Sequence, residues 1–221
     1  MNQIKRIYSI LYKEFGPQGW WPLTPKNQLH PKHNGIQPKT TRQKFEIIIG
    51  AILTQNTSWK NVEKAIFNLN RENLISINKI KKINRKKLAS LVKPSGYYNQ
   101  KAEKLKIAAE FFSKNQNPTR QKLLDVKGIG PETADSILLY AFQRPYFVID
   151  AYTKRIFSRI GICKSDIKYD ELQQIFHQNL SKNTKIFNEY HALVVELGKE
   201  FCTKKPKCSN CPINSYCKKF I

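Results

Sequence analysis

Four of the chain's five cysteines lie close together near the C-terminus, in a pattern that favours metal chemistry. Cys202, Cys208, Cys211 and Cys217 follow the spacing C-x5-C-x2-C-x5-C, whereas Cys163 lies well before them. Four thiolates on a compact loop can bind either Zn²⁺ or a [4Fe–4S] cluster, and spacing alone does not separate the two. The alternative, unligated core cysteines, fits poorly with the polar segment around them. We assign Cys163 to packing.

A glycine-rich turn is the second place where residue types indicate chemistry. In Leu124–Ala134 (LDVKGIGPETA), Gly128 and Gly130 bracket Ile129, and a proline is the expected first residue of the next helix. The glycines permit a tight turn and close approach to the backbone. N–H groups at the start of that helix can then bind an anion such as a phosphate, with Lys127 adding positive charge. The alternative is an ordinary corner between helices, with Ile129 packed into the core.

The composition indicates what kind of partner these motifs serve. Lys and Arg number 39 against 16 Asp and Glu, for a formal net charge of +23. A compact protein with this much positive charge usually has a polyanionic partner, and we expect nucleic acid. No apolar run approaches the roughly 18 residues that span a bilayer. The N-terminal segment is typical of an amphipathic helix rather than a signal peptide. We therefore expect no membrane partner and a cytoplasmic location.

The elements that must position these residues are predicted to be helices almost throughout. Apolar residues recur at helical spacing along most of the chain, and we find no convincing pair of strands, so we predict an all-α fold. A Pro- and Gly-rich aromatic stretch and a polar loop, Lys26–Thr40, interrupt the pattern near the N-terminus. Gly161 is expected to end a helix that begins at Ala151. Further helices near the candidate sites are expected at Lys44–Thr54, Pro131–Phe142, Tyr169–Leu180 and Thr184–Phe201.

Taken together, the motifs resemble the helix-hairpin-helix DNA glycosylases, and within them the endonuclease III group. The resemblance runs from Phe45 to Cys217 and follows the family's order. It is carried by Gly50–Thr57 (GAILTQNT), Pro94–Ala102 (PSGYYNQKA), Leu124–Ala134, Val148–Asp150 and the terminal cysteines. It implies a monomer associated with the nucleoid, with double-stranded DNA in a cleft between two helical lobes. One lobe is a helical barrel at 41–143 that contains the hairpin. The other is a discontinuous domain at 1–40 and 144–221, with the cysteine loop at 199–221.

The resemblance implies that the catalytic carboxylate is Asp150. Breaking an N-glycosidic bond develops oxocarbenium character on the sugar. A carboxylate beside that carbon stabilises the charge and can orient or deprotonate an attacking water. Without the resemblance, Asp150 is equally well explained as the N-cap of the helix Ala151–Ile160. The two roles are compatible.

A lysine that the resemblance would supply is missing. Members that also cut the DNA backbone carry a nucleophilic lysine, which forms a Schiff base with the sugar. The matching position here is Glu132, which cannot form an imine. We therefore predict a monofunctional glycosylase that removes a damaged base, alkylated bases included, with water as the nucleophile. Two alternatives stay open: strand cleavage by a substitute lysine (Lys127 or Lys154), and a non-catalytic DNA-binding module stapled by zinc.

The resemblance also suggests how a base would be extruded and held. Gln55 matches the side chain that fills the gap left by an everted base, and its alternative is a polar residue at a helix C-terminus. Trp20, Trp21 and Phe45 are candidates to stack on that base. With Pro94–Ala102, this arrangement resembles the 3-methyladenine DNA glycosylases, since aromatic faces attract cationic alkylated purines. The alternative is that the tryptophans only anchor their loop.

For the cysteines, the resemblance favours a [4Fe–4S] cluster over zinc, as a structural cofactor. Their first gap is one residue shorter than the family's commoner gap, which alters the first loop. This loop carries Lys204, Lys205 and Lys207, which we expect to contact DNA phosphates. The expected DNA contacts in the hairpin are Lys127, Gly128, Ile129 and Gly130.

Overall fold

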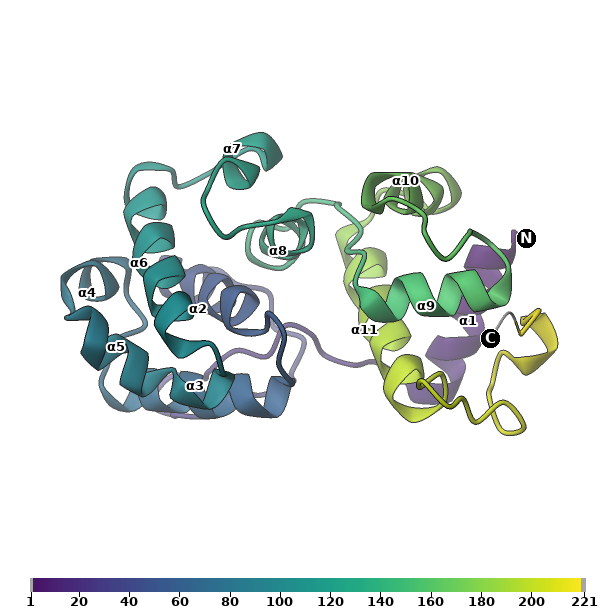
Figure 1. The fold of residues 1–221 in the computed structure, drawn as a ribbon, viewed down its shortest axis with the longest axis horizontal. Coiled ribbons are helices and arrows are strands. Elements are labelled where there is room, and N and C mark those ends of the chain that lie inside the picture. The colour runs from purple at the N-terminus through teal and green to yellow at the C-terminus, as the bar shows by residue number, and fades with distance from the viewer. Residues whose placement is uncertain (1, 220–221) are drawn as a thin grey trace. The chain divides into compact units, whose positions relative to one another are not determined.

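The computed structural model describes residues 2–219, and its regular structure is helical (Figure 1). The prediction of an all-α fold is confirmed, because the described residues form only one isolated bridge, between Leu23 and Lys32, and no sheet. Within the described residues, no helix has the length and apolar character needed to cross a membrane. The α-helices are α1 (Gln3–Phe15), α2 (Thr41–Leu53), α3 (Trp59–Arg71), α4 (Ile77–Lys82), α5 (Arg85–Leu91), α6 (Tyr98–Lys114), α7 (Arg120–Leu124), α8 (Pro131–Ser136), α9 (Ala151–Ile160), α10 (Tyr169–Asn179) and α11 (Thr184–Glu200). The shorter turns are the 3₁₀ segments η1 (Lys93–Ser95) and η3 (Asn214–Tyr216) and the π segment η2 (Ile137–Ala141).

The chain divides into two compact units. Unit 1 takes Met1–Trp20 and Arg144–Ile221, and unit 2 takes Trp21–Gln143. This differs from the expected division, which put residues 21–40 with the discontinuous domain. The reason is packing. The indole of Trp21 lies against Gly50 of α2, and the backbone N–H of Thr24 donates to the buried carboxylate of Glu46.

Unit 2 is built around α2. Nine consecutive residues of α2, from Phe45 to Leu53, are buried. The helix packs against α3, α6, α8 and η2, so apolar neighbours cover it on most sides. A capping box of Thr40 and Gln43 begins the helix by satisfying N–H groups that have no partner within it. The short helices α4 and α5 pack on the outside of α6.

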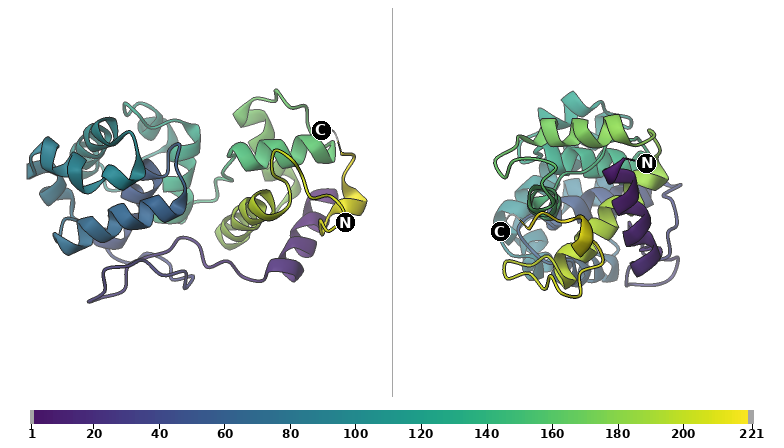
Figure 2. Two further views of the ribbon diagram at one scale, coloured as in Figure 1. Left: turned by 60° about the horizontal axis from the view of Figure 1, so that its bottom comes forward. Right: turned by 90° about the vertical axis from the view of Figure 1, so that its right-hand side faces the viewer.

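Unit 1 packs α1 and α9 against α11 (Figure 2). Its core is a cluster of aromatic rings in which Phe147 stacks on Phe176 at 3.8 Å and lies edge-on to Tyr190. The Tyr190 hydroxyl donates to the carbonyl of Ile4, which fastens α1 to α11. Gly161 adopts φ +90° and ends α9, as predicted.

Candidate functional site

Asp150 is the N-cap of α9, as its position in the sequence predicts. Its backbone is extended, and its Oδ1 accepts hydrogen bonds from the backbone N–H and the hydroxyl of Thr153, both at 2.7 Å. Its second oxygen, Oδ2, lies 3.7 Å from Nε2 of His191 on α11, and the Asp150 side chain is 13% exposed. The cap therefore fixes the orientation of the carboxylate.

The surroundings of Asp150 keep its carboxylate charged. Burial raises the pKa of Asp150, but the neighbouring imidazole of His191 and the hydrogen bonds from Thr153 outweigh this and hold that pKa below its ordinary value. A group in this state is an anion at neutral pH. Sequence analysis missed His191, because the histidine lies far from Asp150 in the chain and only the packing of α9 on α11 brings the two together.

The predicted hairpin is formed by α7, the turn at 125–130 and α8. Gly128 has φ +90°, a conformation that side chains disfavour, so a glycine is required there. Ile129 is 6% exposed and packs into the core beneath the turn. Gly130 has an ordinary φ, and an added Cβ there would meet nothing within 4 Å. Its hydrogen therefore faces open space at the start of α8.

The hairpin's two helices are joined by an ion pair. The guanidinium of Arg120 on α7 donates to both carboxylate oxygens of Asp135 on α8, at 2.8 and 3.1 Å. Lys127 in the turn is 79% exposed and pairs with Glu103 of α6 at 3.0 Å. Its long exposed side chain can exchange that partner for a phosphate at little cost, because exposed ion pairs are weak.

Gln55 lies against the hairpin. Its Nε2 donates to the carbonyl of Gly128 and to the hydroxyl of Thr133, both at 3.0 Å, and its Oε1 accepts from Lys104. The C-cap of α2 is Thr54, so Gln55 does not have the alternative role of capping this helix. The wedge role stays a prediction, and it would require Gln55 to leave these three partners.

Lys101, within the PSGYYNQKA motif, is a second residue that sequence analysis missed. It is 2% exposed, and its ammonium donates to the carbonyls of Leu53 (2.8 Å) and Ser95 (2.6 Å). It thus ties the end of α2 to the turn before α6. That turn holds Tyr97, which is 65% exposed and has φ +45°.

The buried ammonium of Lys101 leads to a prediction about stability and pH. Burial, with the nearby charge of Lys104, lowers the pKa of Lys101 from 10.5 to about 8. Between these values the unfolded chain binds more protons than the folded one, so rising pH favours folding. We expect the unfolding free energy of the wild type, relative to Lys101→Met, to rise between pH 7.5 and 10 by as much as about 3 kcal/mol. Urea denaturation at both pH values measures it. An equal difference at the two pH values would contradict the prediction, and Lys86→Met is the exposed control.

The aromatic residues assigned to a base pocket do not form a site within either unit. Trp21 and Phe45 are core side chains of unit 2, at 7% and 1% exposure. Trp21 packs against the rings of Trp59 and Tyr140, with centroids about 5 Å away. Trp20 belongs to unit 1. The structure thus accounts for Trp21 as an anchor of its loop, and the base pocket stays a prediction.

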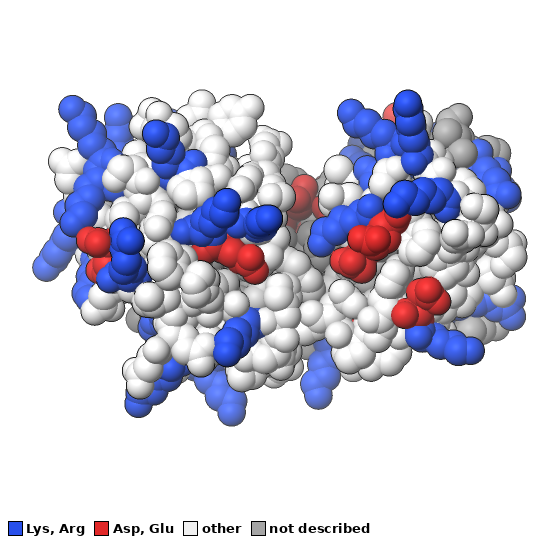
Figure 3. All heavy atoms as spheres, turned by 90° about the horizontal axis from the view of Figure 1, so that it is seen from below, with Lys and Arg blue, Asp and Glu red and all other residues white. Residues whose placement is uncertain are grey.

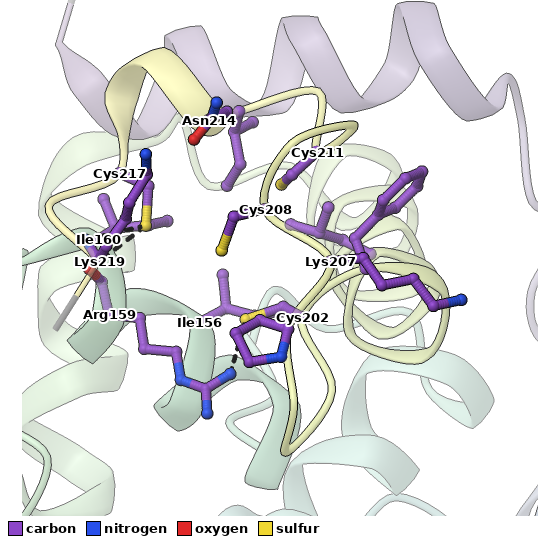
Figure 4. A pocket seen from close by; sticks show the side chains of 14 residues that line it. Ile156, Arg159, Ile160, Cys202, Lys207, Cys208, Cys211, Asn214, Cys217 and Lys219 are labelled. Carbon is purple, nitrogen blue, oxygen red and sulfur yellow. Dashed lines mark hydrogen bonds between the residues drawn. The ribbon is translucent and has the colours of Figure 1, made fainter. Parts of the chain in front are cut away.

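The four C-terminal cysteines line one pocket, part of which is open to solvent (Figure 4). Its remaining walls are largely apolar and come from α9, α11 and the cysteine loop. Burial raises the pKa of Cys211, and the charges of the other three thiols raise it further, as expected for groups that face one another. No group of three or more His, Cys, Asp or Glu side chains in residues 2–219 is arranged to hold a single metal ion.

Two arginines of α9 hold the start of the cysteine loop. Arg155 Nε donates to the carbonyl of Cys202 at 2.8 Å. Arg159 donates to the carbonyl of Thr203 at 2.6 Å and reaches the sulfur of Cys202 at 3.4 Å. The lysines that this loop carries are exposed: Lys204, Lys205 and Lys207. One helix therefore presents Asp150 at its N-terminus and fixes the cysteine loop further along.

The comparison with known families agrees with these features. Residues 49–182, more than half of the chain, match the model of the HhH-GPD superfamily, described as base excision DNA repair proteins. The chain belongs to the HhH-GPD superfamily. The matched range contains the hairpin and Asp150, and the class of activity is that of a DNA glycosylase.

Relatives within the HhH-GPD superfamily cover nearly the whole chain. A Methanocaldococcus jannaschii protein, named as a DNA repair glycosylase, is 45% identical over 98% of this chain and 96% of its own length. The endonuclease III of Sulfolobus acidocaldarius is 32% identical, covering 82% of this chain and 84% of its own. In structure, the H. pylori 3-methyladenine DNA glycosylase MagIII, bound to 1,N6-ethenoadenine, is similar at a TM-score of 0.71 and 30% identity, covering 90% of this chain and 98% of that one. An endonuclease III in a DNA complex shares the fold at a TM-score of 0.79 and 20% identity, covering 99% and 97%.

Proposed function

We propose that this chain hydrolyses the N-glycosidic bond of a damaged base in double-stranded DNA, with water as the nucleophile. The observation that carries the proposal is the Asp150 carboxylate, which caps the start of α9, is fixed in orientation by Thr153 and has a pKa held below its ordinary value. As the base leaves, positive charge develops on the deoxyribose. An anion held close to that sugar stabilises the transition state more than the ground state, which is the condition for catalysis.

The hydrogen bonds of Asp150 suggest a division of labour between its two oxygens. Oδ1 is committed to Thr153, so Oδ2 is the oxygen that would orient a water or take its proton. His191, 3.7 Å from Oδ2, and the bonds from Thr153 help to hold the pKa of this carboxylate below its ordinary value. The proton taken from water would pass to Asp150, and the hydroxide oxygen would bond to the sugar carbon as the base departs with the bonding electrons.

Binding of DNA is proposed to use the hairpin and the exposed lysines around it. The open face of Gly130 allows a phosphate to approach the N–H groups there, and Lys127 is exposed beside them. Gln55, now bonded to Gly128 and Thr133, is proposed to enter the duplex when a base is everted. Lys204, Lys205 and Lys207 would contact phosphates from the cysteine loop.

The cysteines are proposed to hold a [4Fe–4S] cluster. Tetrahedral zinc, with Zn–S bonds of about 2.3 Å, needs four sulfurs drawn tightly together. The four cysteines line one pocket with largely apolar walls, and the similarity to endonuclease III favours an iron–sulfur cluster over zinc there. The guanidinium of Arg159 approaches the sulfur of Cys202, and the backbone N–H of Lys219 approaches that of Cys217, each at 3.4 Å. Such a cluster supplies a structural staple for the loop.

Glu132 leads to a prediction about the class of enzyme. Glu132 lies in the first turn of α8, where a carboxylate stabilises the helix end and cannot form an imine. We expect borohydride to trap no covalent adduct between this protein and DNA that contains an abasic site, whereas an endonuclease III trapped in parallel gives one. An adduct that is lost in Lys127→Ala or Lys154→Ala would instead support a lyase with a substitute lysine.

Alkylated bases are the substrate class we favour. MagIII, which is more similar in sequence than the endonuclease III structure described above (30% against 20% identity), is a 3-methyladenine glycosylase and holds 1,N6-ethenoadenine. A panel of duplexes, each with one lesion, tests this: 3-methyladenine, 1,N6-ethenoadenine, uracil, thymine opposite guanine and an oxidised pyrimidine. Alkali then cleaves any abasic site that forms. Excision of the alkylated bases is expected. Excision of only uracil or thymine would overturn this choice, and excision of none would overturn the proposed function.

A further inference from the structure

The helices α4 and α5 carry a run of positive charge that the active site does not use. Between Glu72 and Glu103 the chain has eight Lys and Arg residues and no Asp or Glu. The apolar residues of this segment, Ile80, Leu88 and Val92, are buried against the rest of unit 2. Seven of the eight cations therefore lie on the outer side, and Lys101 is the buried exception. Figure 3 shows Lys and Arg side chains gathered along the edge where Figure 1 places α4 and α5.

Neighbouring acidic residues neutralise only part of this charge. Lys87 pairs with Glu72, Arg85 lies near Glu103, and Lys81 pairs with Glu110. Three exposed lysines, Lys82, Lys86 and Lys93, form no side-chain hydrogen bond or ion pair with any other residue in 2–219. We call these three the α4–α5 basic face. Because these lysines have no acidic partner, an anion can approach them without displacing one.

The basic face lies next to loops that are proposed to contact DNA. Lys93 begins η1, directly before the turn with the exposed Tyr97. Through Lys101, that turn is tied to the end of α2, two residues before Gln55. The face therefore starts beside the proposed wedge within unit 2 and continues away from it along α5 to α4.

We propose that the α4–α5 basic face binds the phosphate backbone of the duplex beyond the damaged nucleotide. This inference rests on the proposed function, because the same duplex must lie on the loops beside Lys93. Lysines without acidic partners can each bind a phosphate as a point charge. Such contacts do not depend on the base sequence of the DNA. The contact adds affinity that depends on duplex length and on salt.

The test compares a short and a long duplex. Fluorescence anisotropy measures the affinity for a 12- and a 30-base-pair duplex, each with one abasic-site analogue, from 50 to 300 mM salt. The variant is Lys82→Gln/Lys86→Gln/Lys93→Gln. The control, Lys164→Gln/Lys182→Gln/Lys185→Gln, removes three exposed lysines of unit 1 that likewise lack side-chain partners among residues 2–219. Thermal melting verifies that both variants are folded.

We expect the wild type and the control to bind the long duplex at least about tenfold more tightly than the short one, and the variant to lose this gain. The slope of log affinity against log salt on the long duplex should fall by about 2 to 3 in the variant, near 0.9 for each lost phosphate contact. Equal gains for all three proteins, or an equal loss in the control, would overturn the inference. Excision by the wild type on the short duplex would then leave the proposed function standing. A wild type that neither binds nor excises any lesion would overturn both.

Discussion

Asp150→Asn is expected to lower the rate of base excision by a factor on the order of 10² to 10³ or more, with the fold and DNA binding preserved. Asparagine is as good an N-cap as aspartate, so it can still accept the hydrogen bond from the Thr153 N–H that begins α9. It lacks the negative charge that stabilises the sugar. The comparison therefore isolates charge from capping, which are combined at this position.

The measurement is single-turnover excision on whichever lesion the panel identifies, with affinity for an abasic-site analogue measured alongside. Asp150→Ala removes both the charge and the cap, so it should also destabilise the protein by about 1 kcal/mol. Asp166→Asn, at an exposed position, is the matched control and should excise at the wild-type rate. If Asp150→Asn excises as fast as the wild type, our assignment of the catalytic residue is wrong.

Removing one cysteine of the cluster should have the second large effect. We expect Cys208→Ala to lose its brown colour, its absorbance near about 400 nm and most of its iron, which in the wild type should be about four atoms per chain. Cys208 lies in the wall of the cavity, and its loop has little apolar core of its own. Loss of the cluster should remove several kcal/mol of stability. For a chain of this size, this lowers the Tm by about 10 °C.

Cys163→Ala is the control, because Cys163 does not line that cavity. It should keep the iron and the colour. Metal analysis and melting of the three proteins decide the outcome. A colourless wild type with one zinc per chain would contradict the [4Fe–4S] proposal. Unchanged metal content and Tm in Cys208→Ala would contradict a structural role for the cluster.

Much of the fold and part of the site could be predicted, because they depend on local sequence. The helical spacing of apolar residues, the end of α9 at Gly161 and the N-cap at Asp150 each follow from a few neighbouring residues. The cysteines could be grouped because they are close in the chain. His191 beside Asp150, and Lys101 between Leu53 and Ser95, could not be found in this way, since each contact joins distant segments.

The loop at 21–40 shows the same limit. Its polar, proline-containing sequence has no periodicity that could assign it to a unit, so we grouped it with the N-terminal helix. Two packed groups decide its place: the indole of Trp21 on Gly50 and the buried carboxylate of Glu46 on Thr24. Complementarity of shape between distant residues is not visible in local patterns.

The division of the chain has a consequence for its synthesis on the ribosome. The apolar stripe of α1, with Ile4 and Leu11 buried, is covered by α11, which begins only at Thr184. During synthesis α1 is therefore without α11 until the residues between them have been made. Unit 2, in contrast, is one continuous segment, Trp21–Gln143, so its core does not depend on residues made later. We expect unit 2 to fold during translation and unit 1 to be completed last.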